Sequence, residues 1–161
     1  MKYFVKIVLT LVFCIYLIVI TNQILFKYGV PSEVFSHFKD ESWHAYNFIP
    51  FKTIIYYLFI ADINLNIRIM NLGGNIIGFI PFGLILPFLL KKFMNFKMLL
   101  IAVFSFSFTY EAFQFICNLG SFDIDDLILN TLGGALGYLP IKLVHIINSR
   151  KLKQENEVSF K

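Results

Sequence analysis

Charge is scarce in this chain, and its scarcity argues against a water-soluble domain. Of the 161 residues only 15% are charged, whereas 58% are hydrophobic and 20 are phenylalanine. The mean hydropathy is +0.72. Soluble domains carry about 25% charged residues, so we interpret the chain as an integral membrane protein.

Cysteine is also rare, and the motifs of several common sites are absent from the sequence. Cys14 lies within one apolar run and Cys117 near the end of another, so their predicted depths argue against a disulfide. No CxxC pair, His–Cys cluster or phosphate-binding glycine loop occurs. The net charge of +4 is explained by membrane topology and lipid headgroup contact, and it requires no nucleic acid.

Four runs with little or no charge are long enough to cross the hydrocarbon of a bilayer, which takes about 20 residues. They are residues 7–26, 69–90, 98–122 and 127–149. The first run begins after two lysines, as a signal peptide would, but its apolar part is longer and no cleavage site follows. We therefore predict that it is a retained helix.

The basic residues predict an orientation for these spans. Lysine or arginine precedes the first span, fills the loop 91–97 and follows the fourth span, whereas the connection between the third and fourth spans is acidic. The positive-inside rule then places both termini and the loop 91–97 in the cytoplasm. We predict a transmembrane domain over residues 1–150 and a basic cytoplasmic tail over 151–161.

One stretch of the outer connection is apolar but too short to span. Residues 47–60 are interrupted by Pro50 and Lys52, which leaves nine uncharged residues at 53–61. We predict an interfacial or re-entrant helix here, lying over the outer mouth of the bundle. The predicted fold class is thus all-α, an integral membrane bundle of about four transmembrane helices with this extra helix outside. Oligomers are compatible with so small a bundle.

Polar side chains gather at one predicted depth. Counted from Lys97, Glu111 lies about 21 Å along its helix, in the outer third of a hydrocarbon layer about 30 Å thick. The same count places three asparagines there. We predict an outer polar pocket whose candidate ligand-binding residues are Lys52, Asn71, Asn75, Glu111, Gln114, Asp123, Asp125, Asp126 and Asn130.

Glu111 is the candidate catalytic residue. Carboxylates within a membrane are costly and therefore often functional, and Glu111 could act as a general acid or base. The competing interpretation is a structural role, in which Glu111 and Gln114, three residues apart on one helix face, hold neighbouring helices by hydrogen bonds.

Asp123, Asp125 and Asp126 also have two interpretations. Their oxygens suit a divalent cation such as Ca²⁺ or Mg²⁺. Alternatively they mark the acidic start of a helix, with Asp123 or Asp125 as the N-cap. No full ligand set is visible in the sequence, so we predict no cofactor and retain the cation as the alternative.

A weak internal repeat lies within the second and fourth spans. NLGGNIIGFIP at 71–81 aligns without gaps on NTLGGALGYLP at 130–140, which keeps an asparagine, two glycines four apart and a proline. Chance and duplication both explain the match, because glycine and proline are common in membrane helices. In either case we predict that the glycines are packing residues.

The order of the polar motifs resembles the VanZ-like membrane proteins. The matching motifs are NFIPFKTI at 47–54, N-x-x-x-N-x-x-x-F-x-P-x-G at 71–83, E-x-x-Q at 111–114 and F-D-I-D-D-x-x-x-N-x-x-G at 122–133. The family is named for a protein that lowers susceptibility to teicoplanin-type glycopeptides. The resemblance therefore implies a cell-envelope protein of the bacterial plasma membrane, with membrane lipids, a lipid-linked cell-wall precursor or a glycopeptide as partners.

One departure from the family pattern concerns charge. Members often carry an arginine just before the acidic motif, where this chain has Gly120 and Ser121. If that arginine pairs with a carboxylate in the family, the resemblance implies that Lys52 or Arg68 replaces it here, or that the site is more negative.

Three functional hypotheses follow from these observations. The first is a non-enzymatic envelope protein whose outer polar pocket binds a lipid headgroup, a cell-wall precursor or a glycopeptide antibiotic. The second is an intramembrane metal-dependent enzyme that uses Glu111 and the three aspartates on a lipid-linked substrate, although no activated nucleophile is evident. The third is a small transporter or channel subunit, which is disfavoured because residues 84–90 and 139–143 continue no polar track.

Overall fold

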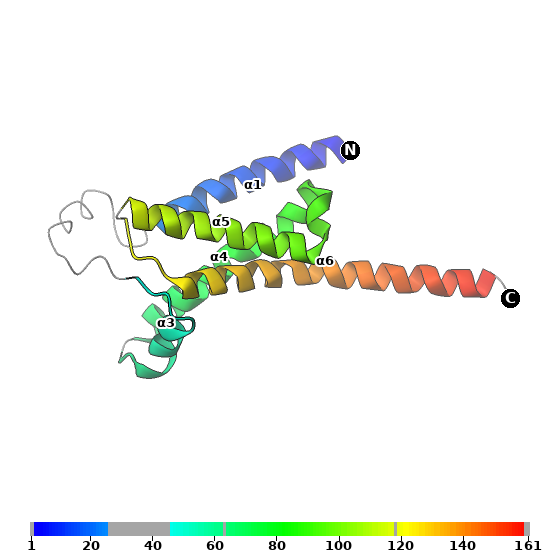
Figure 1. Ribbon diagram of the computed structural model, residues 1–161. Coiled ribbons are helices and arrows are strands. Elements are labelled where there is room, and N and C mark those ends of the chain that lie inside the picture. The colour runs from blue at the N-terminus through cyan, green and yellow to red at the C-terminus, as the bar shows by residue number, and fades with distance from the viewer. Residues whose placement is uncertain (1, 26–45, 63, 118, 160–161) are drawn as a thin grey trace.

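The structure is a computed structural model that describes residues 2–25, 46–62, 64–117 and 119–159. Within these residues, four helices are long and apolar enough to cross a membrane. The helices are α1 (Lys2–Leu25), α4 (Leu65–Leu89), α5 (Phe96–Ile116) and α6 (Ile124–Ser159). They alternate in direction, so the N-terminus and the far end of α6 lie on the same side (Figure 1). The predicted all-α, four-span class is confirmed.

The two ends of the bundle differ. At the acidic end, as we call it, α1 and α5 finish and α4 and α6 begin. At the opposite end, the lysine end, the 3₁₀ turn η3 (Lys91–Met94) joins α4 to α5. Which end faces the cytoplasm stays a prediction from the distribution of lysine and arginine.

The helix boundaries depart from the uncharged runs near the acidic motif. The third span stops at Ile116 instead of continuing to residue 122, and α6 begins at Ile124 instead of 127. Asp123 explains the second boundary, because its Oδ1 accepts the N–H of Asp125 at 2.9 Å in the manner of an N-cap. At its other end α6 continues to Ser159, so residues 151–159 of the predicted tail are helical.

Glycines allow α4 and α6 to pack backbone against backbone. A Cβ atom on Gly133 would lie 2.1 Å from the carbonyl oxygen of Ile76, and one on Gly137 would lie 2.1 Å from that of Ile80. From the other side, a Cβ atom on Gly83 would lie 1.9 Å from the carbonyl oxygen of Gly134. We call this contact the glycine crossing; only residues without a side chain permit it.

The two copies of the repeat are used differently. Gly133 and Gly137 of α6 meet the backbone of α4, but the aligned Gly74 has nothing within 4 Å of its added Cβ. The aligned Gly78 instead meets Ile20 of α1. The predicted packing role therefore holds for the glycines of α6 and not for Gly74.

A hydrophobic core fills the bundle on the lysine side of the acidic residues. Its buried members come mainly from α4, α5 and α6: Phe79, Phe82, Leu86, Leu99, Val103, Tyr138 and Ile141. Helix α1 adds Ile20 and is tied to α4 by the Tyr16 hydroxyl, which donates to the carbonyl of Gly78 at 2.9 Å. The acidic residues therefore lie at the acidic end of the bundle, outside this core.

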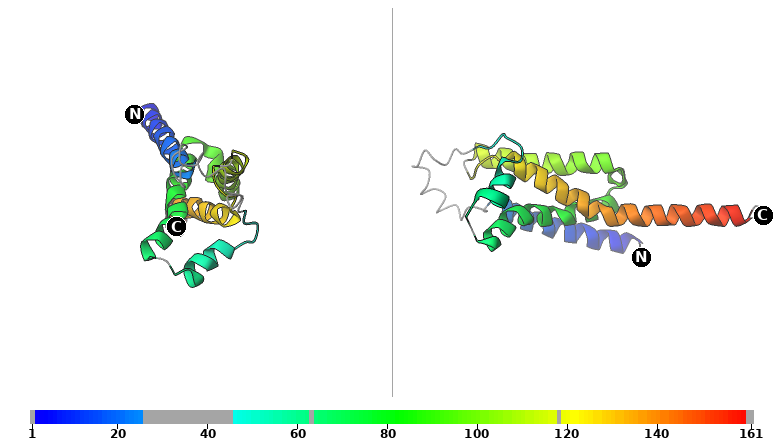
Figure 2. Two further views of the ribbon diagram at one scale, coloured as in Figure 1. Left: turned by 90° about the vertical axis from the view of Figure 1, so that its left-hand side faces the viewer. Right: turned by 90° about the horizontal axis from the view of Figure 1, so that it is seen from below.

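The segment predicted to form an interfacial helix is helical, but it lies elsewhere than expected. It consists of α3 (Lys52–Ile55) continued by the π-helix η2 (Tyr56–Ile60). Seen along the bundle, this segment flanks α4 and α6 and does not cross the ends of all four helices (Figure 2). Arg68 of α4 holds it there, because its guanidinium donates to the carbonyls of Leu58 at 3.2 Å and Ala61 at 3.1 Å.

Candidate functional site

The site begins where two distant segments pair at the acidic end. The N–H of Asn47 donates to the carbonyl of Phe122 at 2.8 Å, and the N–H of Ile124 donates to the carbonyl of Asn47 at 3.0 Å. This parallel bridge between Asn47 and Asp123 brings residues 46–54 against the start of α6. The NFIPFKTI and acidic motifs are therefore parts of one site.

Asp125 is the most enclosed of the three aspartates, with none of its surface exposed. Its carboxylate accepts the backbone N–H of Phe51 at 2.5 Å, of Thr53 at 2.7 Å and of Ile54 at 3.1 Å. These are the free N–H groups at the start of α3, which a carboxylate satisfies well. Phe51 has a φ of 67°, which few residues other than glycine adopt. Asp125 thus caps α3 from a different helix.

Asp123 joins the same two segments through side chains. Its Oδ1 accepts the Asn47 amide at 2.9 Å, and its Oδ2 accepts the Thr53 hydroxyl at 2.6 Å. The Asn47 amide also donates to the Thr53 hydroxyl at 3.0 Å. Together with the bond from Asp125 N–H, these contacts favour the interpretation of Asp123 as a helix cap.

The carboxylates do not fit a metal centre. Asp123 binds Asn47 and Thr53, Asp125 binds backbone N–H groups, and Asp126 accepts a bond from the Asn75 amide of α4. In the described parts of the chain, no group of three His, Cys, Asp or Glu side chains is arranged to hold an ion. We therefore derive no chemistry through a metal.

Glu111 and Asp126 connect three helices inside the acidic end. Glu111 of α5 is 3% exposed, and its Oε2 accepts the N–H of Asp123 at 3.0 Å. Asp126 of α6 is 9% exposed and bonds to Asn75 of α4. Both acids therefore hold the start of α6 in place, which agrees with the structural interpretation of Glu111.

Three other predicted residues make separate contacts. Gln114 donates to the carbonyl of Ile24 at 2.8 Å and so ties α5 to α1. The Asn130 amide donates to the Ser107 hydroxyl at 2.8 Å, one turn deeper than Glu111. Asn71 donates to the carbonyl of Ile67 in its own helix at 2.8 Å. The nine predicted residues are thus distributed over several contacts and do not surround one pocket.

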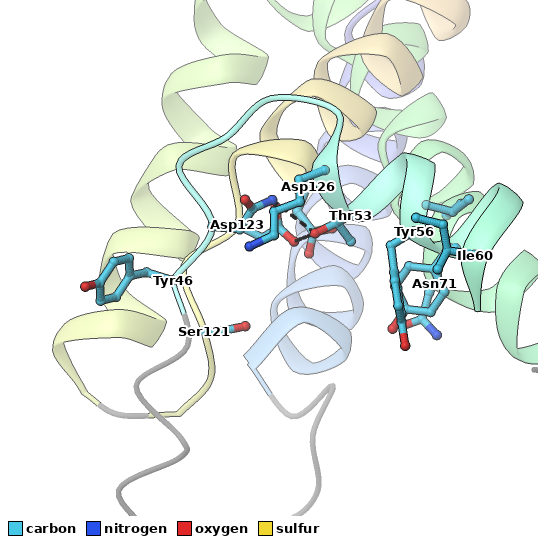
Figure 3. Close-up of a pocket in the computed structure, with 12 residues that line it drawn as sticks. Tyr46, Thr53, Tyr56, Ile60, Asn71, Ser121, Asp123 and Asp126 are labelled. Carbon is cyan, nitrogen blue, oxygen red and sulfur yellow. Dashed lines mark hydrogen bonds between the residues drawn. The ribbon is translucent and has the colours of Figure 1, made fainter. Parts of the chain in front are cut away.

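A cavity of about 450 Å³ lies between the α3–η2 segment and the starts of α4 and α6. Four predicted residues line it: Lys52, Asn71, Asp123 and Asp126. The other five, Asn75, Glu111, Gln114, Asp125 and Asn130, are not among its lining residues. In Figure 3, Asp123, Asp126 and Thr53 lie at the centre of the lining, with Tyr46 and Ser121 on one side and Tyr56, Ile60 and Asn71 on the other.

Sequence reasoning missed part of this lining. Asn47, Thr53 and the tyrosines Tyr46, Tyr56 and Tyr57 line the cavity, and none was a candidate. The NFIPFKTI motif contains two of them and was the available signal. The tyrosines follow no motif, because what places them is the position of α3 and η2 beside α6.

Lys52 and Arg68, the two basic residues that could balance the carboxylates, have different surroundings. Lys52 is exposed and lines the cavity. Arg68 directs both terminal nitrogens to the carbonyls of Leu58 and Ala61. Asp123 and Asp125 are meanwhile matched by neutral donors, namely amide, hydroxyl and backbone N–H groups. Lys52 thus shares the cavity lining with Asp123 and Asp126, whereas Arg68 is not among the lining residues.

Comparison with known proteins gives a family match over most of the chain. The VanZ/LLP1 family matches residues 13–145. Protein VanZ of Enterococcus faecium is 46% identical to this chain over 63 residues, which are 39% of this chain and 38% of that protein. The chain therefore aligns with less than half the length of this relative. No solved structure matches the chain.

Proposed function

This chain belongs to the VanZ/LLP1 family of membrane proteins, and we propose that it binds the polar head of an amphiphile in the cavity at its acidic end. The observation that carries the proposal is the cavity itself. Its volume of about 450 Å³ falls within the range of about 300–1,000 Å³ that is typical of small-molecule sites.

The position of the cavity suits an amphiphile. It lies where α4 and α6 begin, at one end of the candidate spans, which is the level of lipid headgroups. Tyrosine and lysine, which favour that level, contribute to the lining. Ile60 and Leu72 add apolar surface beside the polar groups. A polar head could therefore contact polar side chains while the first part of its acyl chain contacts apolar ones.

The packing below the cavity favours binding over transport. The hydrophobic core fills the bundle toward the lysine end, and the glycine crossing closes the contact of α4 with α6. Catalysis by Glu111 is also disfavoured, because Glu111 is buried and bonded to the backbone at the start of α6. A bound headgroup requires neither a continuous channel nor a reacting group.

Three amphiphiles of the cell envelope fit this description: a phospholipid, a lipid-linked cell-wall precursor and an acylated glycopeptide. Lowered susceptibility to a teicoplanin-type glycopeptide would follow if the cavity held the drug or its membrane-bound target. The bacterial plasma membrane is the location in which all three are found together.

Native mass spectrometry of gently solubilised protein tests the proposal. Ser121 lines the cavity, and the change Ser121→Phe should obstruct it. Ser105, an exposed residue of α5, provides the matched control Ser105→Phe. We expect a co-purifying lipid adduct in the wild type and in the control, and its loss in Ser121→Phe. An adduct of equal intensity in all three proteins, or in none of them, would contradict the proposal. The mass of the adduct would identify the amphiphile.

A further inference from the structure

The lining of the cavity carries more negative than positive charge. Among the described residues, the lining contains two carboxylates, Asp123 and Asp126, and one cationic side chain, Lys52, which gives a formal charge of −1. Arg68 does not change this balance within the lining, because it lies outside the set of lining residues and donates to carbonyl oxygens. A head that is only anionic would add to the excess of negative charge, whereas a head with a cationic group would offset it.

The aromatic rings of the lining are a second indication that the ligand carries a cationic group. Tyr46, Tyr56 and Tyr57 all line the cavity. The rings of Tyr56 and Tyr57 are nearly perpendicular, at 76° with 5.7 Å between their centroids. Ring faces attract ammonium groups, and sites for alkylated ammonium ligands are commonly built from several rings set at angles to one another.

The hydrogen-bonding capacity of the lining also favours a cationic group on the ligand. The two oxygens of Asp123 accept three hydrogen bonds, two at Oδ1 and one at Oδ2. A carboxylate offers about four lone-pair positions, so Oδ2 can accept one more bond. The amide of Asn47, in contrast, already donates to both Thr53 and Asp123. The lining thus has acceptor capacity for an ammonium.

Lys52 suits an anionic group, such as a phosphate, on the same ligand. Its side chain is exposed and belongs to the lining, whereas Asp126 is 9% exposed. A phosphate would pair with Lys52, and an ammonium would pair with the carboxylates and contact the tyrosine rings. We infer that the amphiphile held by this cavity has a zwitterionic head, with an ammonium group placed among Asp123, Asp126 and the tyrosines and a phosphate at Lys52.

This inference rests on the proposed function and specifies its ligand class. Two sources supply an ammonium on a phosphate-bearing lipid, namely an amino phospholipid and a lipid-linked wall precursor with a free amine. The chemistry recognised is the same in both cases, so the test includes both sources.

Purified protein in nanodiscs that contain equal amounts of two lipids allows a direct competition. The first pair is phosphatidylethanolamine with its N-acetylated form, which has the same chains and phosphate but no ammonium. The second pair is a lipid-linked wall precursor with a free side-chain amine and the same precursor after N-acetylation. Lipid retention is read by native mass spectrometry for the wild type, Tyr56→Leu with Tyr57→Leu, and Ser121→Phe. Tyr3→Leu, at an exposed tyrosine of α1, is the matched control.

We expect the wild type and Tyr3→Leu to retain the amine form about tenfold better than its acetylated form in at least one pair. The pair that shows the preference identifies the source. The double tyrosine variant should lose most of this preference and still retain some lipid. Equal retention of both forms, with loss of both in Ser121→Phe, would overturn the ammonium inference and leave the proposed function standing. Retention that does not change in Ser121→Phe would overturn both.

Discussion

Helices α4 and α6 are joined twice, by the glycine crossing and by the acidic end, and the two contacts have different physical origins. At the crossing, Gly133 and Gly137 bring one backbone against another. At the acidic end, Asn75 bonds to Asp126, and Asp125 binds the N–H groups of a separate segment. The crossing therefore sets how closely the helices approach, and the acidic end sets what lies beside them.

The difference also concerns what each contact excludes. The glycine crossing tolerates no added atom, because neighbouring carbonyl oxygens occupy the space. The acidic end instead leaves a cavity of about 450 Å³ beside its hydrogen bonds. We expect the crossing to determine whether the bundle forms, and the acidic end to determine whether the cavity keeps its shape.

The largest effect is expected from Gly137→Val. Its Cβ would lie 2.1 Å from the carbonyl oxygen of Ile80, a backbone atom that can move only with its helix. We expect a loss of about 3 kcal/mol in the free energy of unfolding, measured in detergent micelles. Gly74→Val is the matched control, since nothing lies within 4 Å of that Cβ. Equal stability of the two variants would refute the assignment of the crossing to Gly137.

A smaller and more local effect is expected from Asp125→Asn. An amide has one acceptor oxygen, so it cannot satisfy all of the N–H groups of Phe51, Thr53 and Ile54 as the carboxylate does. We expect a loss of about 2 kcal/mol, with faster hydrogen exchange at those three N–H groups and unchanged exchange at the crossing. Asp62→Asn, at an exposed aspartate that precedes α4, is the control. Protection that persists at the start of α3 would show that Asp125 does not hold it.

The smallest effect is expected from Thr53→Val. The change keeps the shape of the side chain and removes the hydroxyl that donates to Asp123 and accepts from Asn47. We expect a loss of about 1 kcal/mol, together with weaker retention of the bound lipid. Thr109→Val, at an exposed threonine of α5, should change neither quantity. A loss as large as that of Asp125→Asn would mean that the two aspartates act as one unit.

The spans and the crossing could be predicted from the sequence because their signals are local. An uncharged run of sufficient length is read directly from the residues, and so are glycines four apart. Even so, the sequence assigned the same packing role to Gly74 and Gly133, and only Gly133 meets a neighbouring backbone. Spacing alone does not say which side of a helix meets a neighbour.

The division of the polar residues could not be predicted in the same way. A count of residues placed Glu111 and Asn130 at one depth, yet Asn130 bonds to Ser107, which lies one turn from Glu111. Because α5 and α6 are antiparallel, one turn into the bundle along α6 from Asp126 corresponds to one turn back along α5 from Glu111. That register depends on where α6 begins, and Asp123 fixes its beginning through contacts with a segment far away in the sequence.

The contact of Asp125 with α3 has a consequence for how the chain can vary over evolutionary time. The partners of the carboxylate are N–H groups, which every residue except proline carries. This contact therefore places no demand on the side chains at positions 53 and 54, although Thr53 has a separate contact with Asp123. Position 51 is restricted by its φ of 67°. Mutation can remodel the side of the cavity built on α3 while its attachment to α6 persists, so related chains could acquire different ligands on an unchanged frame.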